Sequence, residues 1–229
     1  NRKWSPTGVP TIFKMIEVLD RDFKVNFLFT VKDSGRDFKS NWKLNKDAEI
    51  VIDGLKNNIK ILTGTRYFSL FGRSKITIFL REFRHFLIIY FKILTYKPNI
   101  IYIDNSNIFS AALITKIFRK KFIILRIMGV YPYMKSIINS KRFIDRINLY
   151  AYRSNFSLVV CTQDGSGVTK WCSDVLNKNT KYKILINGIN KEIKNTKIDP
   201  NLNKIPQNKY KILFIGKLEE YKGIKEFVS

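Results

Sequence analysis

The stretch "NIIYIDNSNIFSAALITKIFRKKFIILRIMG", residues 99–129, decides the fold class of this chain. Its first part, 99–105, is a short run rich in Ile, with Asp104 near its end, and is typical of a buried strand. Residues 108–121 have helical spacing, with small residues that allow close packing. Residues 122–129 form a second apolar run, which ends at Gly129. Strand, helix and strand in this order are typical of a unit of two parallel strands joined by a helix.

The same alternation continues on both sides of this stretch. Apolar, β-rich runs predict strands at 25–31, 58–64, 157–163 and 182–188, and apolar periodicity predicts helices at 11–20, 74–96, 141–153 and 164–176. The polar segment between the first two strands is expected to be a loop with a short helix. Near-continuous apolar strands favour an α/β fold with a Rossmann-like, doubly wound parallel sheet. Ligands of such sheets bind beyond the carboxyl ends of the strands, where Gly64, Gly129, Gly188 and Gly216 lie.

The carboxyl-terminal part of the chain predicts a domain boundary. Residues 191–209 are polar, contain two prolines and lack periodicity, so we interpret them as a linker between domains. The run "KILFIGKLEEYKGI", 211–224, then begins a second α/β domain that has barely started. We therefore expect one Rossmann-like domain over 1–190 and a truncated second domain over 210–229. Asn1 is not an initiator Met, so we expect part of the amino-terminal region to be missing too.

Composition restricts the classes of protein that remain. The 229 residues are 45% hydrophobic, which is enough for a core, and no uncharged run approaches the about 18 residues of a membrane-spanning helix. The two cysteines, Cys161 and Cys172, show neither metal-ligand spacing nor a disulfide framework, so a reducing, cytoplasmic setting fits best. The net charge of +24 predicts binding to polyanions, either nucleic acid or an anionic membrane surface. Biased use of Lys, Asn and Ile explains the same charge without any partner.

Four stretches in order resemble the family-four, or group 1, retaining glycosyltransferases of the GT-B fold. They are the amino-terminal loop with Gly8, residues 97–132, residues 157–190 and residues 211–224. The resemblance covers most of the chain, and the ordered set is more specific than any single stretch. It implies an amino-terminal acceptor-side domain followed by the start of the domain that binds the nucleotide-sugar donor.

The resemblance places a donor diphosphate site in the last stretch, at Gly216, Lys217, Lys222 and Gly223. Backbone N–H groups at a helix start and two cations can neutralise a diphosphate as it leaves, without a metal. The family usually has Arg where this chain has Lys217, and Lys lacks the bidentate fork of a guanidinium. An ordinary pair of surface lysines after a strand is the alternative interpretation.

The resemblance also supplies candidate cleft residues, namely Gly8, Asp104, Asn105, Arg126, Met128, Gly129, Asn187 and Gly188. The family often has His where this chain has Met128, and a thioether is a poor partner for a sugar hydroxyl. We therefore expect either altered sugar recognition or a contribution from Arg126 and Tyr131. Asp104 either meets the acceptor or caps the helix after it. Asn187 and Gly188 form a turn with a structural role, and the sole histidine, His85, is expected at a surface or packing position rather than in catalysis.

Helix 74–96 has two interpretations. As a core helix, it covers the sheet with its apolar residues. As an interfacial helix, it places Arg73, Lys75, Arg81 and Arg84 against anionic headgroups while Phe and Ile enter the lipid. Such contact suits a lipid-linked acceptor.

Three functions follow from these observations. The leading one is transfer of a sugar, with retention, from a nucleotide-sugar to a glycan or lipid-linked acceptor in cell-surface polysaccharide synthesis. No metal or cofactor is expected, and the catalytic residues are expected beyond Ser229, so the 229 residues alone should be inactive. The second is a basic α/β protein that binds nucleic acid or anionic membrane without catalysis, although no nucleic-acid-binding motif is present. The third is another nucleotide-sugar enzyme such as an epimerase, but the glycine-rich dinucleotide fingerprint is absent.

Overall fold

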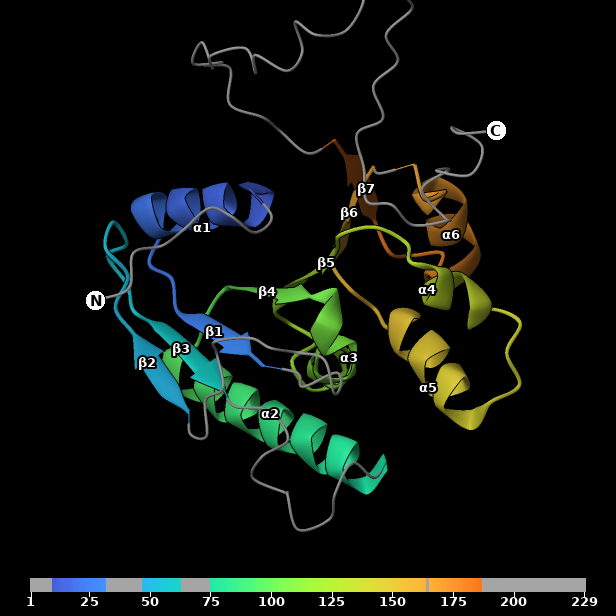
Figure 1. The fold of residues 1–229 in the computed structure, drawn as a ribbon, viewed down its shortest axis with the longest axis horizontal. Helices are drawn as coiled ribbons and strands as arrows, with labels where there is room; N and C mark the ends of the chain where they lie inside the picture. The colour runs from blue at the N-terminus through green and yellow to red at the C-terminus, as the bar shows by residue number, and fades with distance from the viewer. Residues whose placement is uncertain (1–9, 32–46, 63–74, 164, 187–229) are drawn as a thin grey trace, which may run out of the picture. The chain divides into compact units, whose positions relative to one another are not determined.

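A computed structural model describes residues 10–31, 47–62, 75–163 and 165–186, and these form an α/β fold (Figure 1). All of them belong to the unit Asn1–Gly188, and the second unit, Ile189–Ser229, lies outside them. The strands are β1 (Phe27–Thr30), β2 (Ala48–Ile50), β3 (Ile59–Leu62), β4 (Ile100–Asp104), β5 (Phe122–Ile127), β6 (Leu158–Thr162) and β7 (Tyr182–Leu185). The helices are α1 (Pro10–Asp22), α2 (Lys75–Tyr96), α3 (Ile108–Ile117), α4 (Pro132–Ser136), α5 (Phe143–Tyr152) and α6 (Val168–Val175), with a 3-10 turn, η2 (Asn105–Asn107), before α3.

The larger sheet is parallel and has the strand order β4-β5-β6-β7. The centre of this sheet is apolar and buried. Its fully buried residues include Leu125 and Ile127 of β5 and Val159 and Cys161 of β6. Uncharged residues occupy these positions since both faces of the sheet are covered. The expected parallel α/β architecture is confirmed for this sheet.

The smaller sheet has the order β1-β3-β2 and is mixed. β1 pairs with β3 in parallel, with Phe29 opposite Ile61, whereas β2 runs antiparallel to β3. The expectation that only loop and a short helix join β1 to β3 is therefore wrong at β2. Three residues with one charge, Ala-Glu-Ile, are too short to produce a periodic signal, and pairing with β3 decides their conformation.

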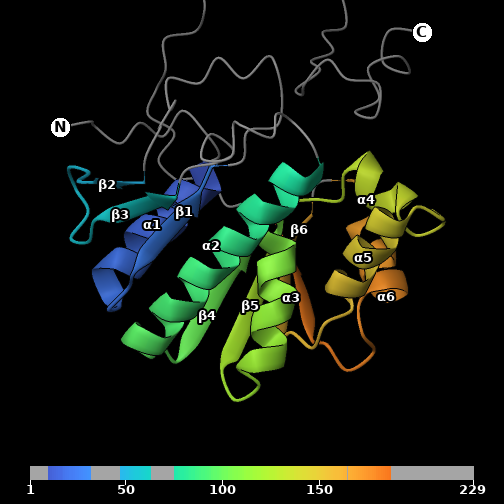
Figure 2. The same cartoon turned by 90° about the horizontal axis from the view of Figure 1, so that it is seen from below.

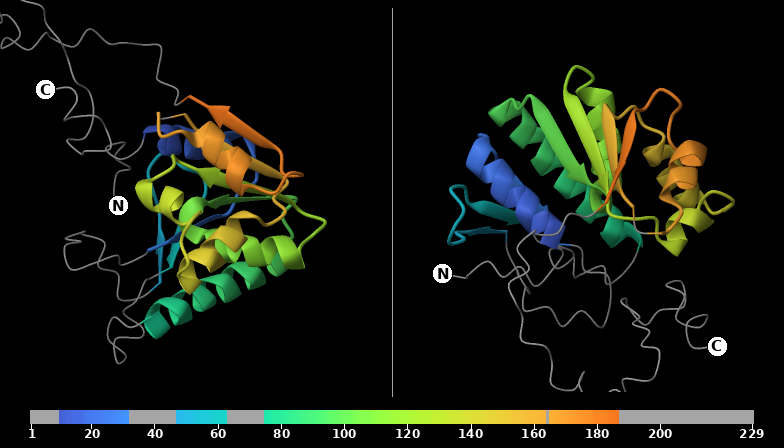
Figure 3. Two further views of the ribbon diagram at one scale, coloured as in Figure 1. Left: turned by 90° about the vertical axis from the view of Figure 1, so that its right-hand side faces the viewer. Right: turned by 90° about the horizontal axis from the view of Figure 1, so that it is seen from above.

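Helices cover the strands from both sides. α1 lies on the opposite side of the strands from α2 (Figures 1 and 3), and α2 lies beside α3 (Figure 2). Asp20 connects α1 to the turn before β3, because its carboxylate accepts hydrogen bonds from the backbone N–H groups of Lys56 and Asn57. Burial raises the pKa of Asp20, but these hydrogen bonds outweigh it and the net pKa is lowered.

The helices differ from the expectation in several places; α6, for example, begins at Val168 rather than at residue 164. α3 ends at Ile117 rather than at residue 121, because Phe118 leaves the helical conformation and Lys121 N–H bonds the Phe118 carbonyl in a turn. After this turn the chain is extended, and Phe122 pairs with Ile100 of β4. α4 was not expected; Pro132 stands at its first turn, a position where proline needs no N–H partner.

Candidate functional site

The carboxyl ends of β1, β4, β5 and β6 lie at one edge of the strands. Thr30, the last residue of β1, donates a hydrogen bond from Oγ1 to Oδ1 of Asn107 over 3.0 Å. Asp104 ends β4 opposite Arg126 of β5, and Arg126 in turn stands opposite Val160 of β6. This shared edge therefore gathers polar side chains from four strands that are far apart in the sequence.

Arg126 is the central charged residue of this edge. Although it is 8% exposed, no carboxylate of the described ranges lies within ion-pair distance of it. Its Nη2 donates to Oγ1 of Thr162 at 2.6 Å, and its Nε donates to Sδ of Met128 at 3.3 Å. A guanidinium carries five N–H donors, so donors remain for a ligand. Buried charges are normally paired, which makes Arg126 a candidate anion site.

Asp104 has the capping role that the sequence offered as one alternative. Its Oδ1 accepts from the backbone N–H of Ser106 at 2.9 Å, at the start of η2. The neighbouring Asn105 accepts a short hydrogen bond from the Tyr152 hydroxyl, and Tyr152 packs edge-on against Trp171. Asn105 therefore connects the edge to α5 and has a structural role, while the second carboxylate oxygen of Asp104 remains able to accept.

The loop after β5 is fixed by its backbone conformation and by a hydrogen bond to the loop before α6. Gly129 has φ of 139°, a conformation that residues with a Cβ rarely adopt, so a side chain here would strain the backbone. The next residue, Val130, donates its N–H to Ser166 Oγ at 3.0 Å and thereby connects this loop to the loop before α6. Met128 is half-buried beside Arg126, where its sulfur is a weak acceptor.

A cavity of about 820 Å³ opens at this edge. Its polar end is lined by Thr30, Asp104, Ser106, Asn107, Arg126 and Met128. Asn105 and Gly129 are not among its lining residues, so the structure brings Asp104, Arg126 and Met128 together and leaves those two outside. Tyr102 also lines the cavity, and its pKa is raised to about 12. Burial of the hydroxyl is the largest cause; the positive charge of Arg126 opposes this rise, and the negative charge of Asp104 adds to it.

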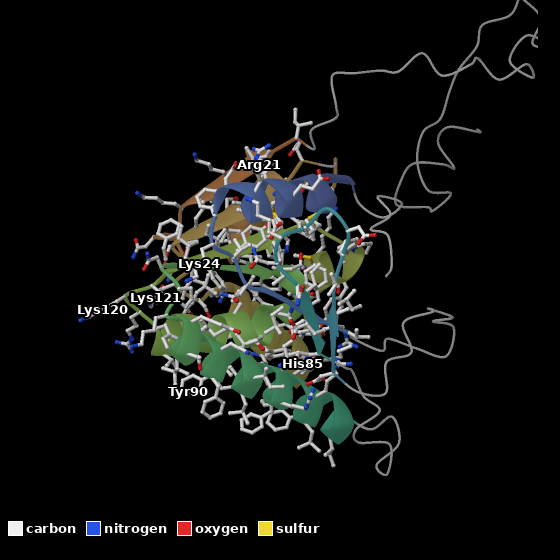
Figure 4. The ribbon with its side chains drawn as sticks, turned by 90° about the vertical axis from the view of Figure 1, so that its left-hand side faces the viewer. Arg21, Lys24, His85, Tyr90, Lys120 and Lys121 are labelled. Carbon is white, nitrogen blue, oxygen red and sulfur yellow. The ribbon has the colours of Figure 1, made fainter. Side chains whose placement is uncertain are left out.

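The other predicted residues are outside the described part of the chain. They are Gly8, Asn187, Gly188, Gly216, Lys217, Lys222 and Gly223. His85 is described, and it is fully buried in α2 on the side that faces the strands (Figure 4), as expected for packing. Across the described residues, no group of three or more His, Cys, Asp or Glu side chains could hold a metal ion.

Thr30, Asn107 and Thr162 were missed by the sequence analysis. Each stands at or just after a strand end, which is the one signal that could have selected them. Hydroxyl and amide groups are common in loops, however, and only the register of the strands places these three next to Arg126.

The arrangement can bind a ligand at the carboxyl edge of the strands. It offers a cation, one carboxylate oxygen, and hydroxyl and amide groups, all of which suit an anionic or polyhydroxylated ligand. Comparison with known proteins found no match to a family model, a curated protein or a solved structure. None of the helices described here is both long and apolar enough to cross a membrane.

Proposed function

We propose that this chain is the acceptor-side part of a glycosyltransferase that moves a sugar, with retention, from a nucleotide-sugar to a glycan or lipid-linked acceptor. The observation that carries the proposal is Arg126, a buried guanidinium without a carboxylate partner in the described ranges, at the carboxyl edge of a parallel sheet and facing a cavity. Parallel α/β sheets bind ligands at this edge. The resemblance of four ordered sequence stretches supports the same function, in the setting of cell-surface polysaccharide synthesis.

Each residue of the edge has a chemical part in this proposal. Arg126 donates to a phosphate or sugar oxygen, and Asp104 accepts from a sugar hydroxyl, which together suit a phosphorylated or polyol ligand. Thr162 and Met128 orient the guanidinium through its Nη2 and Nε. The leaving diphosphate is expected at Lys217 and Lys222, and the catalytic residues beyond Ser229.

Binding of nucleotide-sugars by the 229-residue protein tests the proposal. Isothermal titration calorimetry with UDP-, GDP- and ADP-sugars and with inorganic phosphate would compare the native protein with Arg126→Met. Hydrogen bonds to charged groups contribute about 1.5–3 kcal/mol, so we expect the best ligand to bind about 10- to 100-fold more weakly to the variant.

Arg119→Met is the matched control, because Arg119 is exposed and, among the described residues, its side chain donates to the Lys116 carbonyl. It should bind the same ligand like the native protein. Equal weakening in both variants would mean that general positive charge, not the edge, binds the ligand. Saturable, sequence-independent binding of RNA or DNA with no nucleotide-sugar binding would favour the nucleic-acid alternative.

Catalysis gives a second, separate prediction. If the donor-side residues lie beyond Ser229, the purified 229-residue protein should transfer no sugar. Incubation with radiolabelled nucleotide-sugars and lipid extracts, followed by chromatography, measures this. Transfer above the level of heat-treated protein would show that the catalytic residues lie within the chain.

A second candidate function, peripheral binding to an anionic membrane at the inner face of the cell, rests on the outer face of α2. Ile76, Phe79, Phe83 and Phe91 are exposed there, and the rings of Phe79 and Phe83 stack at 6.3 Å. Figure 4 shows Tyr90 on this outer side, with Lys120 and Lys121 near the end of the helix. Aromatic residues flanked by cations suit an interfacial helix.

The basic residues of this face differ from those expected. Arg81 is buried and pairs with Glu82 at 2.8 Å, and Arg84 pairs with Asp47 at 2.6 Å, so neither is positioned to meet headgroups. Arg73 lies outside the described residues, as does the side chain of Lys75. Co-sedimentation with phosphatidylserine-containing vesicles should weaken in the Phe79→Ser, Phe83→Ser double variant. It should not weaken in Val51→Ser, which changes an exposed residue directly after β2. Equal vesicle binding by the two variants would show that the outer face of α2 does not bind the membrane.

A further inference from the structure

The two cysteines of the chain are in contact with each other in the interior of the fold. Cys161 belongs to β6 and Cys172 to α6, and their exposed fractions are 0% and 1%. Their Sγ atoms are 3.3 Å apart, and both are free thiols. A disulfide bond is about 2.05 Å long, so the sulfur atoms need to approach each other by about 1.3 Å to form one. The spacing of the two residues along the sequence gives no indication of this contact.

The contact follows from the faces of the two elements. Successive side chains of a strand point to opposite faces of the sheet, so Cys161 lies on the face opposite to Thr162. On α6, the buried residues Val168, Cys172 and Val175 recur at helical spacing and form one stripe. α6 lies beside β6 and β7 (Figures 1 and 3), and this stripe brings Cys172 into contact with Cys161. The two thiols therefore lie where α6 packs on the sheet.

Hydrogen bonding makes the two thiols chemically unequal. The Cys161 thiol donates to the Cys172 sulfur, which raises the pKa of Cys161 and lowers that of Cys172. Burial raises the pKa of Cys161 further, and at Cys172 it opposes the lowering. Thiolates rather than thiols attack disulfides. Cys172 is therefore the attacking sulfur, and Cys161 is the one that completes the bond.

We propose that Cys161 and Cys172 form a reversible modification site, at which exchange with a low-molecular-weight disulfide of the glutathione type joins them in an intramolecular disulfide that fixes α6 to β6. The Cys172 thiolate attacks one sulfur of oxidised glutathione, and the first glutathione thiolate leaves. Cys161 then loses its proton and attacks the Cys172 sulfur of the mixed disulfide, which expels the second glutathione thiolate. Two protein thiols are thereby oxidised, one oxidised glutathione is reduced, and the two protons end on the two glutathione thiols. This inference does not depend on the proposed function.

Local opening of α6 gives the oxidant access to these buried sulfur atoms. α6 is eight residues long, and Gly167 at its amino end provides no side-chain cap. Its outer side is exposed at Thr169, Lys170, Ser173 and Asp174. Short elements without a cap open at a lower free-energy cost than the centre of a fold. When α6 closes again, the two sulfur atoms return to contact, which favours the intramolecular disulfide over a mixed one.

The disulfide also restrains a segment that contributes to the candidate site. The residues between the two cysteines begin with Thr162, which accepts the hydrogen bond from Arg126. They also include Ser166, whose hydroxyl oxygen accepts the N–H of Val130. Closing this short loop removes conformational freedom mainly from the unfolded chain. We therefore expect the oxidised protein to be more stable than the reduced protein.

Equilibration with glutathione tests the inference on the native 229-residue protein. Samples are held at a series of ratios of reduced to oxidised glutathione, in buffer and in enough urea to unfold the chain. Free thiols are then blocked with N-ethylmaleimide, and mass spectrometry measures the fraction that has lost two hydrogen atoms and carries no maleimide. The equilibrium constant for the disulfide should be at least about tenfold larger in the folded protein than in the unfolded one. An equal or smaller constant in the folded protein would overturn the proposal.

Access and stability give two further readouts. Folded, reduced protein that stays reduced, while protein oxidised in urea and refolded stays oxidised, would show that α6 does not open and would also overturn the proposal. The disulfide should raise the melting temperature by about 4 °C or more, and dithiothreitol should reverse this rise. Cys172→Ala is the control, because it retains Cys161 and cannot form the disulfide. A rise of the same size in this variant would mean that the oxidant acts elsewhere in the chain, which contradicts the proposal.

Discussion

At the scale of single residues, Arg126 and Arg119 differ in the burial of their charged side chains. Arg126 and Arg119 are seven residues apart, yet Arg126 is 8% exposed and Arg119 is exposed to solvent. Both are arginines next to apolar residues, so the local pattern does not reveal this difference in burial. Burial is what makes Arg126 a candidate ligand group, because a guanidinium removed from water needs an oxygen acceptor to compensate.

Asp145 gives a pH-dependent prediction at this scale. Its carboxylate accepts from Ser140 Oγ at 2.6 Å, Arg142 Nε at 2.7 Å and the Tyr133 hydroxyl at 2.9 Å. The Ser140 hydrogen bond is the largest cause that lowers the pKa of Asp145; burial opposes it, and Arg142 and Tyr133 add to it. A lowered pKa stabilises the folded state above the unfolded pKa of about 3.9, and this contribution is lost as pH falls through the folded value.

Asp145→Asn should therefore lower the melting temperature at neutral pH, and the difference from the native protein should narrow as pH falls below about 4. Asp174→Asn is the control, because Asp174 is exposed and its closest partner is Ser173 Oγ at 3.4 Å. Thermal unfolding followed by circular dichroism across this pH range measures both. A constant difference at every pH would contradict the role of the Asp145 charge.

At the scale of elements, α4, α5 and α6 are held together by one aromatic cluster. Trp171 of α6 donates Nε1 to the carbonyl of Met134 in α4 at 2.8 Å, and its ring meets Tyr152 of α5 edge-on at 5.0 Å. Tyr152 in turn donates to Asn105, so the cluster connects three helices to the candidate site. Edge-to-face geometry adds to the burial of both rings.

Trp171→Phe keeps most of the ring and removes the N–H donor. We expect the free energy of unfolding to fall by about 1–3 kcal/mol, since the buried Met134 carbonyl loses this partner. Tyr150→Phe is the control, because it also removes a hydroxyl, but an exposed one bonded to Lys116 at 3.2 Å. Urea unfolding compares the two; an equal loss in both would mean that the indole hydrogen bond contributes little.

At the scale of the whole molecule, charge sets the response to salt. With 42 Lys and Arg residues against 18 Asp and Glu, the chain repels itself at neutral pH. Ion pairs recorded in the described ranges involve only four basic residues, at positions 21, 81, 84 and 142. The net charge of +24 therefore leaves long-range repulsion between basic residues.

Raising NaCl from about 0.01 M to about 0.3 M shortens the screening length from about 30 Å to below 10 Å. The melting temperature of the 229-residue protein should rise over this range, because screening removes repulsion that destabilises the compact state. Differential scanning fluorimetry measures it, and NaCl avoids the specific effects of sulfate or phosphate. A fall in melting temperature would mean that attractive pairs dominate instead.

The sequence alone predicted the α/β class, the parallel direction of β4 to β7, and the helices α3, α5 and α6 between these strands, but not α4. Uncharged runs such as Ile100–Ile103 and Phe122–Leu125 carry that information locally, because a buried parallel strand needs apolar residues on both faces. The family resemblance also selected Asp104, Arg126 and Met128, which lie at or next to strand ends in the structure.

Only the tertiary structure decided which of these residues share a cavity, that Thr30 and Asn107 join them there, and that Thr162 bonds Arg126. It likewise decided that β2 pairs antiparallel and that Arg81 and Arg84 pair with carboxylates. The physical reason is the same in each case. Pairing and burial depend on which distant segments meet, and a pattern read along the chain contains the partners but not their contacts.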